Sequence, residues 1–202
     1  MSTAATSAAT APATFAFTAE NVAKANAIVA KYPKGKHQSA LLPLLDLAQR
    51  QGGGWLPQVA LDYVADFLSL APIRVYEVAT FYTMFNLKPV GRHHVQVCTT
   101  TPCWLRGSDE VLEACRHRLG IEVGETSADG KFTLSEVECL AACVNAPVVL
   151  VGEDFYEDLD AASTTRLLDA LAAGKPFKAG PQVKRQTSAP ISGAKTLVRK
   201  GA

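Results

Sequence analysis

Long apolar runs are absent from this chain of 202 residues. Its uninterrupted apolar stretches fall far below the roughly 18 residues that a membrane-spanning helix needs, so we expect no transmembrane segment. The start of the sequence lacks the basic and apolar regions of a secretory signal, and we expect no export. Cysteine is also scarce, because five residues are too few for a disulfide scaffold. An odd number without an export signal favours free thiols, four of which are available for a metal site.

Several catalytic signatures are missing as well. Gly52–Gly54 is followed by Trp55 rather than by the Lys and Ser/Thr of a phosphate loop, so we expect no nucleotide binding by this chain alone. No Cys-x-x-Cys motif occurs, which argues against thiol–disulfide exchange. The histidines form no metal-binding pair at i, i+4, and we assign them no chemistry: they are His37, His93, His94 and His117.

The first residues of the chain carry no charge, and the last residues carry charge of one sign only. Residues 1–17 carry no charged side chain and are rich in Ala, Thr and Ser, so we expect a disordered tail; the lack of Arg makes it a poor mitochondrial presequence. Residues 175–202 hold seven of the 20 basic residues and none of the 19 acidic ones, which leaves the remainder with a net charge of −6. We expect residues 178–202 to form a basic tail suited to an acidic partner.

Two alternatives to a partner arm stay open for the basic tail. It is either a solvated tail or a nucleic-acid-binding segment with salt-dependent affinity. The acidic body of the chain, and a single aromatic residue, Phe177, near the tail, disfavour nucleic acid.

Helical periodicity runs from Thr18 to about Leu87. Thr18 can cap the first helix, and Gly52–Gly54 stops the second. Pro57 and Pro72 are each well placed as the first residue of a further helix. With 48% hydrophobic residues the chain can bury a core, and these segments predict a small helical bundle over residues 18–90 with no ligand set in it.

Beyond Gly91 the pattern becomes mixed. We predict strands and helices in the order strand, helix, strand, strand, strand, helix. They are a strand 94–98, a helix Ser108–Leu119 capped by Gly120, strands 131–137 and 148–151, a short strand at Phe155-Tyr156, and a helix from Ser163 to about Gly174. This is an α/β layer of about 85 residues, with two helices packed on one sheet.

Four cysteines form two pairs, each at the end of a predicted strand. Cys98-x4-Cys103 is followed 35 residues later by Cys139-x3-Cys143. If the two strands lie side by side, both pairs converge at one edge of the sheet. Four thiolates can hold one zinc ion or one [2Fe–2S] cluster, and spacings of four and three residues favour the cluster. A zinc-stapled interaction domain stays open as an alternative.

The residues near these cysteines, and the fifth cysteine, are interpreted without a role as metal ligands. Thr99–Thr101 offers hydroxyl and N–H groups that can donate hydrogen bonds to sulfur. Trp104 either shields the site from water or packs in the core. The fifth cysteine, Cys115, lies on the apolar face of its predicted helix, where a buried free thiol is expected.

These features resemble a known family. The two cysteine loops, 98–104 and 139–147, are similar to those of the thioredoxin-like [2Fe–2S] ferredoxins, and in particular of the 24-kDa-type subunits of respiratory complex I, the NADH:ubiquinone oxidoreductase. Gly54-Trp55-Leu56 and residues 75–85 resemble the helical N-terminal region of those subunits. The resemblance covers about residues 18–180.

The resemblance implies a fold and a ligand set. The bundle is followed by a thioredoxin-like [2Fe–2S] domain over residues 91–177, with Pro147 as the candidate cis-proline of that fold. Cys98 and Cys103 bind one iron of a single [2Fe–2S] cluster, and Cys139 and Cys143 bind the other. No catalytic residue and no further cofactor-binding residue is implied.

It also implies partners and a place in the cell. The helical part docks on a subunit that binds FMN and NADH, within the peripheral arm of the complex, and the chain exchanges single electrons with that FMN. Such a subunit has no complete active site of its own and lies in the cytoplasm, peripheral to the inner membrane through the complex. Equivalent diaphorase subunits of NAD-linked formate dehydrogenases and hydrogenases share the signature.

Overall fold

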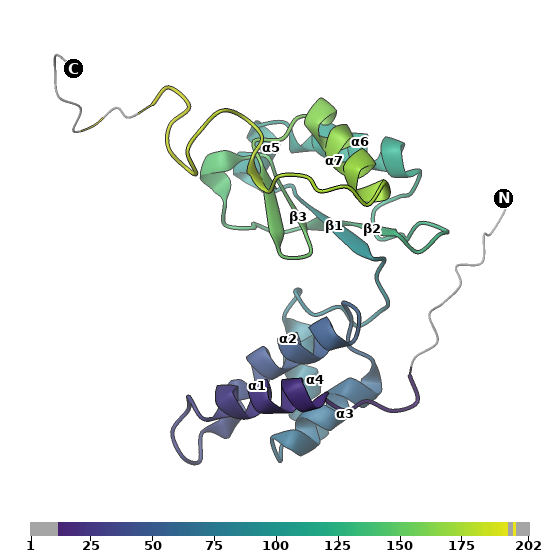
Figure 1. Ribbon diagram of the computed structural model, residues 1–202, viewed down its shortest axis with the longest axis vertical. Coiled ribbons are helices and arrows are strands. Elements are labelled where there is room, and N and C mark those ends of the chain that lie inside the picture. Colours follow the sequence, from purple (N-terminus) through teal and green to yellow (C-terminus); the bar gives the residue numbers. More distant parts are fainter. Residues whose placement is uncertain (1–11, 194–195, 197–202) are drawn as a thin grey trace. The chain divides into compact units, whose positions relative to one another are not determined.

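The structure, a computed structural model, describes residues 12–193 and 196. The chain divides into two units between Val90 and Gly91, and each is described by itself (Figure 1). In the part of the chain that the structure describes, no helix combines the length and the apolar character needed to cross a bilayer.

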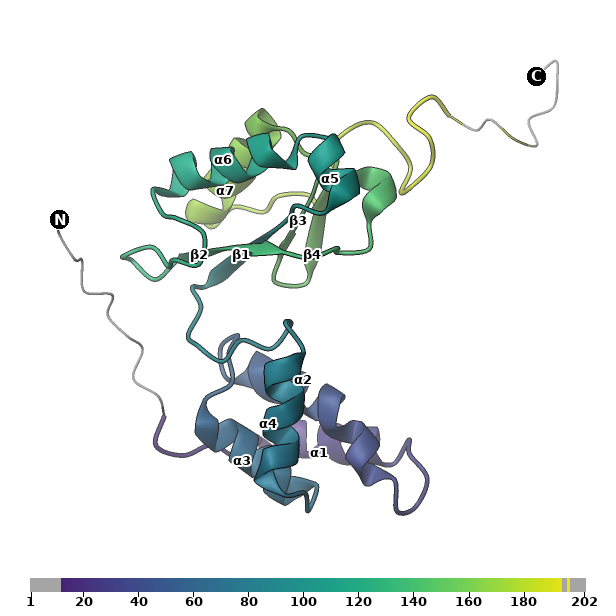
Figure 2. The ribbon, with the colours of Figure 1, turned by 180° about the vertical axis from the view of Figure 1, so that it is seen from behind.

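The first unit is a bundle of four α-helices (Figures 1 and 2). They are α1 (Ala19–Val29), α2 (Leu41–Gln51, preceded by the 3-10 helix His37–Ala40), α3 (Gln58–Phe67) and α4 (Pro72–Phe81). The predicted cap is present, because the Thr18 hydroxyl accepts a hydrogen bond from the Asn21 N–H at 3.3 Å. Pro72 begins α4 as predicted, whereas Pro57 precedes the first residue of α3 instead of being it.

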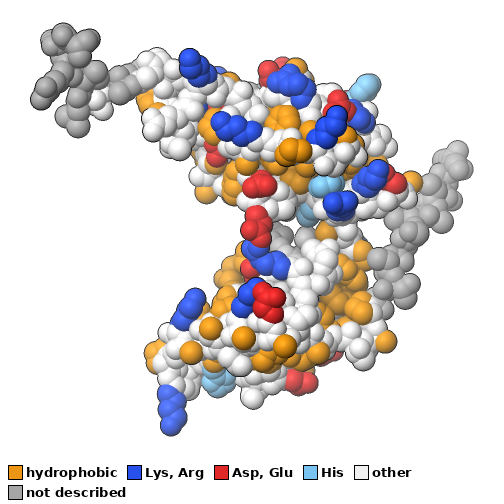
Figure 3. Space-filling model, viewed as in Figure 1, with side chains coloured by type: hydrophobic (Ala, Val, Ile, Leu, Met, Phe, Trp, Pro, Cys, Tyr) orange, Lys and Arg blue, Asp and Glu red, His pale blue; other side chains and the backbone are white. Residues whose placement is uncertain are grey.

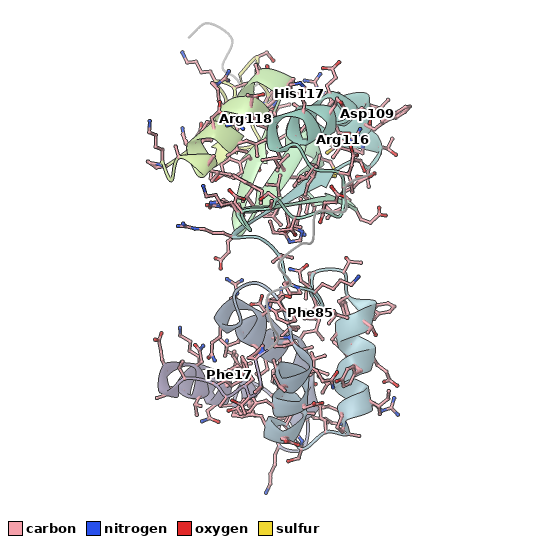
Figure 4. All side chains as sticks on the ribbon, turned by 90° about the vertical axis from the view of Figure 1, so that its right-hand side faces the viewer. Phe17, Phe85, Asp109, Arg116, His117 and Arg118 are labelled. Atoms are coloured by element: carbon pink, nitrogen blue, oxygen red, sulfur yellow. The ribbon has the colours of Figure 1, made fainter. Side chains whose placement is uncertain are left out.

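The core of this unit reaches into the segment before α1. Phe17 is only 7% exposed, and its ring lies 5.2 Å from that of Tyr63 and 5.7 Å from that of Phe15 (Phe17 is labelled in Figure 4). Composition alone assigns both phenylalanines to the tail of residues 1–17, since two aromatics in an Ala/Thr-rich stretch show no periodicity. Residues 1–11 lie outside the described part of the chain.

The second unit is a five-stranded sheet with helices on it. Its elements are β1 (His93–Cys98), α5 (Thr101–Leu105), α6 (Ser108–Leu119), β2 (Phe132–Val137), the 3-10 helix η2 (Cys143–Asn145), β3 (Val148–Val151), β4 (Asp154–Glu157), α7 (Ala161–Ala172) and β5 (Gly180–Pro181). The strand order is β2-β1-β3-β4-β5. β1 runs parallel to β2 and antiparallel to β3, while β4 runs antiparallel to β3 and parallel to β5.

One face of the sheet is covered by α6 and α7, which lie side by side (Figures 1 and 2). The buried core beneath them includes Val95, Leu134 and Leu167, all fully shielded from solvent. Arg118 of α6 pairs with Asp169 of α7 at 2.5 Å, and both side chains remain about half exposed (Arg118 is labelled in Figure 4). The mixed helix and strand content confirms the predicted fold class.

Three local features of this unit differ from the sequence-based expectation. The last helix begins at Ala161 with Asp160 as its N-cap, so Ser163 is its third residue and not its first. A five-residue helix, α5, occupies what the pattern predicts to be loop, because so short a helix shows no apolar period. β5 adds residues 180 and 181 to the edge of the sheet, inside the region expected to be tail.

The N-cap of α7 gives a first prediction. Asp160 accepts a hydrogen bond from the Ser163 N–H at 2.7 Å, and the Ser163 hydroxyl closes the reciprocal capping box. We expect Asp160→Ala to lower the free energy of unfolding by about 1 kcal/mol at neutral pH in urea titrations. Hydrogen bonds from the Ser163 side chain and backbone hold the pKa of Asp160 below its usual value, so the contribution is present at neutral pH and is lost as pH falls through that lowered pKa. A difference between the two proteins that persists unchanged in strong acid contradicts this origin.

Candidate metal centre

The parallel pairing of β1 and β2 brings the two cysteine loops to the same edge of the sheet. Cys98 is the last residue of β1 and lies in register with Val137, the last residue of β2. Cys139 follows two residues later. Because parallel strands end at the same edge, the chain leaves both strands where the cysteine loops begin. The predicted convergence of the strand ends is therefore confirmed.

The first pair of thiols is buried. Cys98 and Cys103 are each 1% exposed and pack with Ala146 and Val148. Cys103 is the third residue of the short helix α5, which carries Pro102 near its start. This helix places Cys103 in the same buried cluster as Cys98, the last residue of β1. Cys98 and Cys103 are near enough for each to influence the pKa of the other.

The second pair of thiols is exposed. The sulfur atoms of Cys139 and Cys143 are 3.4 Å apart, and the Ala141 N–H donates to the Cys139 sulfur at 3.3 Å. Ala141 has φ = 61°, a left-handed conformation that costs a residue with a Cβ of order 1–3 kcal/mol. The turn therefore accepts strain in order to direct an N–H group at sulfur.

Other contacts join the two pairs. The Thr100 hydroxyl lies 3.3 Å from the Cys98 sulfur and is near enough to Cys139 to help lower the pKa of that thiol. The Leu140 backbone, from the second loop, lies near enough to Cys98 to help lower the pKa of that thiol. Cys103 and Cys143 are close enough for the charge on one to influence the other. The two thiol pairs thus lie near each other at this edge of the sheet.

The environment divides each pair into one thiol with a lowered pKa and one with a raised pKa. Burial raises the pKa of Cys98, but hydrogen bonds from Thr100 and Leu140 outweigh it and hold the pKa below its usual value. Burial, with the neighbouring Cys98, raises the pKa of Cys103 to about 12. The Ala141 N–H lowers the pKa of Cys139, while the hydrogen bond with Cys139 raises that of Cys143.

This donor set suits an iron–sulfur cluster. All four thiols are free, thiolate is the ligand that such clusters take, and N–H and hydroxyl donors already point at the sulfur atoms. Over residues 12–193 and 196, no three His, Cys, Asp or Glu side chains are grouped so that they could hold a metal ion. The sulfur atoms of Cys139 and Cys143 are in contact, and Cys98 and Cys103 share one buried cluster, so the thiols lie as two pairs and not as a closed group around one point.

Two further residues singled out by the sequence have simpler roles. Cys115 is fully buried in the core under α6, and burial raises the pKa of its thiol to about 12, as a structural cysteine requires. Trp104 is 56% exposed and donates from Nε1 to Asp109 at 3.1 Å, so of its two alternatives, core packing is wrong. Pro147, the candidate cis-proline, follows a cis peptide bond from Ala146.

Sequence reasoning did not identify every residue that shapes the site. Leu140 and Ala141 act through backbone N–H groups, for which the side-chain type gives no signal. Arg185 lies in the region expected to be a tail, yet it hydrogen-bonds the segment directly after Cys143. Only Thr100 was foreseeable, as a hydroxyl next to a cysteine.

Comparisons with known proteins agree with this geometry. The chain is 57% identical over 184 residues to "NADH dehydrogenase [ubiquinone] flavoprotein 2, mitochondrial" of Dictyostelium discoideum, covering 91% of this chain and 74% of that protein. It is 59% identical over 157 residues to a subunit of the NADH-quinone oxidoreductase of Rickettsia conorii, covering 78% of this chain and 94% of that protein.

A solved structure gives the same fold at lower similarity. A chain of an NAD+-reducing [NiFe]-hydrogenase matches with a TM-score of 0.58 and 24% identity over 66% of this chain and 23% of that chain, a likeness that concerns the fold alone. The family model described as "Thioredoxin-like [2Fe-2S] ferredoxin" matches residues 25–172, a span that includes both thiol pairs. With four thiols gathered at one sheet edge and most of its length matched, the chain belongs to the thioredoxin-like [2Fe–2S] ferredoxin family.

Proposed function

We propose that this chain is an electron-transfer subunit of an NADH:quinone oxidoreductase and that its four paired cysteines hold one [2Fe–2S] cluster. The ligands are Cys98, Cys103, Cys139 and Cys143. The observation that supports this most strongly is the meeting of two thiol pairs, one from each cysteine loop, through Thr100 and Leu140. The names of relatives that are 57% and 59% identical support the choice of complex.

The arrangement of the pairs supports a division of the ligands. Cys98 and Cys103 bind one iron, and Cys139 and Cys143 bind the other, since the first two share one buried cluster and the sulfur atoms of the second two are 3.4 Å apart. When bound, the cluster supplies one-electron redox chemistry. The Thr100 hydroxyl and the N–H groups of Leu140 and Ala141 stabilise negative charge on the thiolate sulfurs, which favours the reduced state.

The proposed partner supplies the remaining chemistry. The chain exchanges single electrons with FMN in a neighbouring subunit that also binds NADH, and it has no complete active site of its own. The large apolar side chains exposed on and after α4, including Ile73, Phe81 and Met84, are suited to docking on that subunit (Figure 3 shows apolar side chains in orange on this unit). Within the complex, the chain lies peripheral to the inner membrane on the cytoplasmic side.

A diaphorase subunit of an NAD-linked hydrogenase or formate dehydrogenase is the second candidate. It is favoured by the fold shared with the NAD+-reducing hydrogenase, at 24% identity. The relatives named for NADH-quinone oxidoreductase are more than twice as similar in sequence. We therefore prefer the quinone-linked complex.

Co-purification from the native cell tests the proposal. An affinity tag on the full chain is expected to recover a membrane-associated complex that contains FMN and reduces quinone with NADH. Recovery with formate dehydrogenase or hydrogenase activity supports the second candidate instead. Recovery of a colourless chain with stoichiometric zinc contradicts both and returns the assignment to a zinc-stapled module.

The position next to the flavin gives a second prediction. A two-electron hydride donor must feed one-electron carriers, and a nearby cluster shortens the lifetime of one-electron-reduced flavin. We expect Cys103→Ser, introduced into the assembled complex, to raise superoxide production during NADH oxidation. The control is the wild-type complex at the same FMN content. An unchanged superoxide rate in a complex shown to lack this cluster contradicts the role.

A further inference from the structure

The segment after β5 is folded onto the domain that carries the thiols. We call residues 182–192 the strap; it lies in the yellow segment that follows α7 in Figure 1. β5 pairs with β4 through Tyr156–Gly180 and Glu157–Pro181, and the Gln182 N–H continues the ladder to the Glu157 carbonyl at 2.9 Å. The sheet therefore sets where the strap begins.

Arg185 is the residue of the strap that enters the domain. Its Nη2 lies 2.9 Å from Oδ1 of Asp158, and the side chains of this ion pair are only 8% and 4% exposed. Its Nη1 donates to Oδ1 of Asn145 at 2.6 Å and to the Val144 carbonyl at 3.2 Å. One guanidinium group thus joins the loop after β4 to the turn that contains Cys143.

Asn145, the partner of Arg185 in that turn, forms hydrogen bonds with several neighbouring groups. It is 3% exposed, and its Nδ2 donates to the Glu157 carboxylate and, at 3.2 Å, to the Thr187 carbonyl of the strap. Its backbone carbonyl accepts the Asp158 N–H at 2.7 Å. Since Asn145 ends the 3-10 turn η2 that Cys143 begins, the strap fixes the backbone that presents this sulfur.

The strap also shapes the space beside the same sulfur. Cys143 lines a surface crevice whose other residues include Arg185, Ser188, Pro190 and Ile191 of the strap. The strap therefore forms one wall of the crevice through which solvent approaches the exposed thiol.

A purely stabilising role does not explain this arrangement. Buried ion pairs are often no more stabilising than well-packed apolar residues, because desolvation offsets their attraction. Here the pair is also incomplete: Arg185 Nε and Asp158 Oδ2 are buried without a hydrogen-bond partner. What the guanidinium adds over an apolar side chain is directional hydrogen bonding to two neighbouring groups, Val144 and Asn145.

We propose that Arg185 is a positioning residue for the iron–sulfur site, which holds the Cys143 turn in the geometry required to bind iron. This inference rests on the proposed ligand set. Outer contacts that orient a metal ligand typically change metal affinity roughly 10–100-fold when they are removed. The strap then acts within the domain, in place of the partner arm that its basic composition suggests.

Substitutions in the full chain test the proposal. Three variants are prepared anaerobically: Arg185→Gln, Arg185→Lys and, as the control at an exposed neighbouring residue, Lys184→Gln. Measurements are the rate of iron loss to a chelator, the electron paramagnetic resonance spectrum of the reduced protein and the melting temperature. We expect Arg185→Gln to lose iron roughly 10–100-fold faster than the wild type and to show a shifted spectrum. Lys184→Gln is expected to match the wild type.

Arg185→Lys separates positioning from folding. The lysine keeps a positive charge beside Asp158 but lacks the fork that reaches Asn145 and Val144. For this variant we expect a melting temperature close to that of the wild type, together with faster iron loss and a shifted spectrum. If Arg185→Gln does not fold, Arg185→Lys alone tests the positioning role. Wild-type spectra and iron-loss rates in Arg185→Lys, or equal acceleration in Lys184→Gln, overturn the proposal. Absence of iron from the wild type overturns the proposed function instead.

Discussion

Cys103→Ala is expected to abolish the visible absorption and the stoichiometric iron of the purified protein, whereas Cys115→Ala is expected to leave both intact. The two positions are closely matched, since Cys103 is 1% and Cys115 0% exposed and each substitution removes one sulfur atom from a packed environment. They differ in what the sulfur contacts. Cys103 lies in one buried cluster with Cys98, which adds to burial in raising its pKa, while burial alone raises the pKa of the Cys115 thiol.

Visible spectroscopy and iron analysis of anaerobically purified proteins check this prediction. Loss of one of four thiolates leaves one iron with an incomplete ligand set, so a large loss of iron is expected at Cys103. Circular dichroism of both variants controls for folding. The ligand assignment is contradicted if Cys115→Ala loses the iron while Cys103→Ala retains it.

Leu45→Ala and Leu134→Ala are expected to be the most destabilising substitutions of those considered, each in its own unit. Both side chains are fully buried, Leu45 in the core of the helical bundle and Leu134 in the core between the sheet and its helices. Truncation of a buried leucine costs about 2–5 kcal/mol, because it removes apolar contacts and leaves a cavity. A loss of this size lowers the melting temperature by roughly 10 °C or more in a domain of this size.

Differential scanning calorimetry of the full chain checks this prediction and its selectivity. The two leucines belong to separate hydrophobic cores, so each substitution is expected to lower the melting of one unit and leave the other near its wild-type value. Leu87→Ala, at an exposed leucine, is the control for truncation without a cavity. A shift of less than about 3 °C for either core variant contradicts the assigned burial.

Helices with a capping glycine or a proline at the first position could be predicted from the sequence almost residue by residue. α6 spans Ser108–Leu119, as predicted, because Gly120 takes the left-handed conformation that ends the helix. α4 starts at Pro72. The first residue of a helix has no intrahelical partner for its N–H group, so proline, which lacks this group, loses no hydrogen bond there. The cysteine pairs could be located because each follows an alternating apolar strand.

Features that depend on tertiary packing could not be predicted in the same way. Phe17 is buried by Tyr63, a residue far along the chain. Arg185 sits in a basic, Gly- and Pro-containing stretch whose composition is typical of a tail, and only the pairing of β5 with β4 brings it to Asp158. α5 is a single turn, and its place depends on the packing of Cys103 against Val148.

Anaerobic preparation of the full chain, followed by quantification of iron, acid-labile sulfide and zinc, tests the central claim most directly. Two irons and two sulfides per chain, with a spectrum that bleaches on reduction, are predicted for four thiols arranged as two pairs. One zinc per chain, with no iron and no sulfide, contradicts the account.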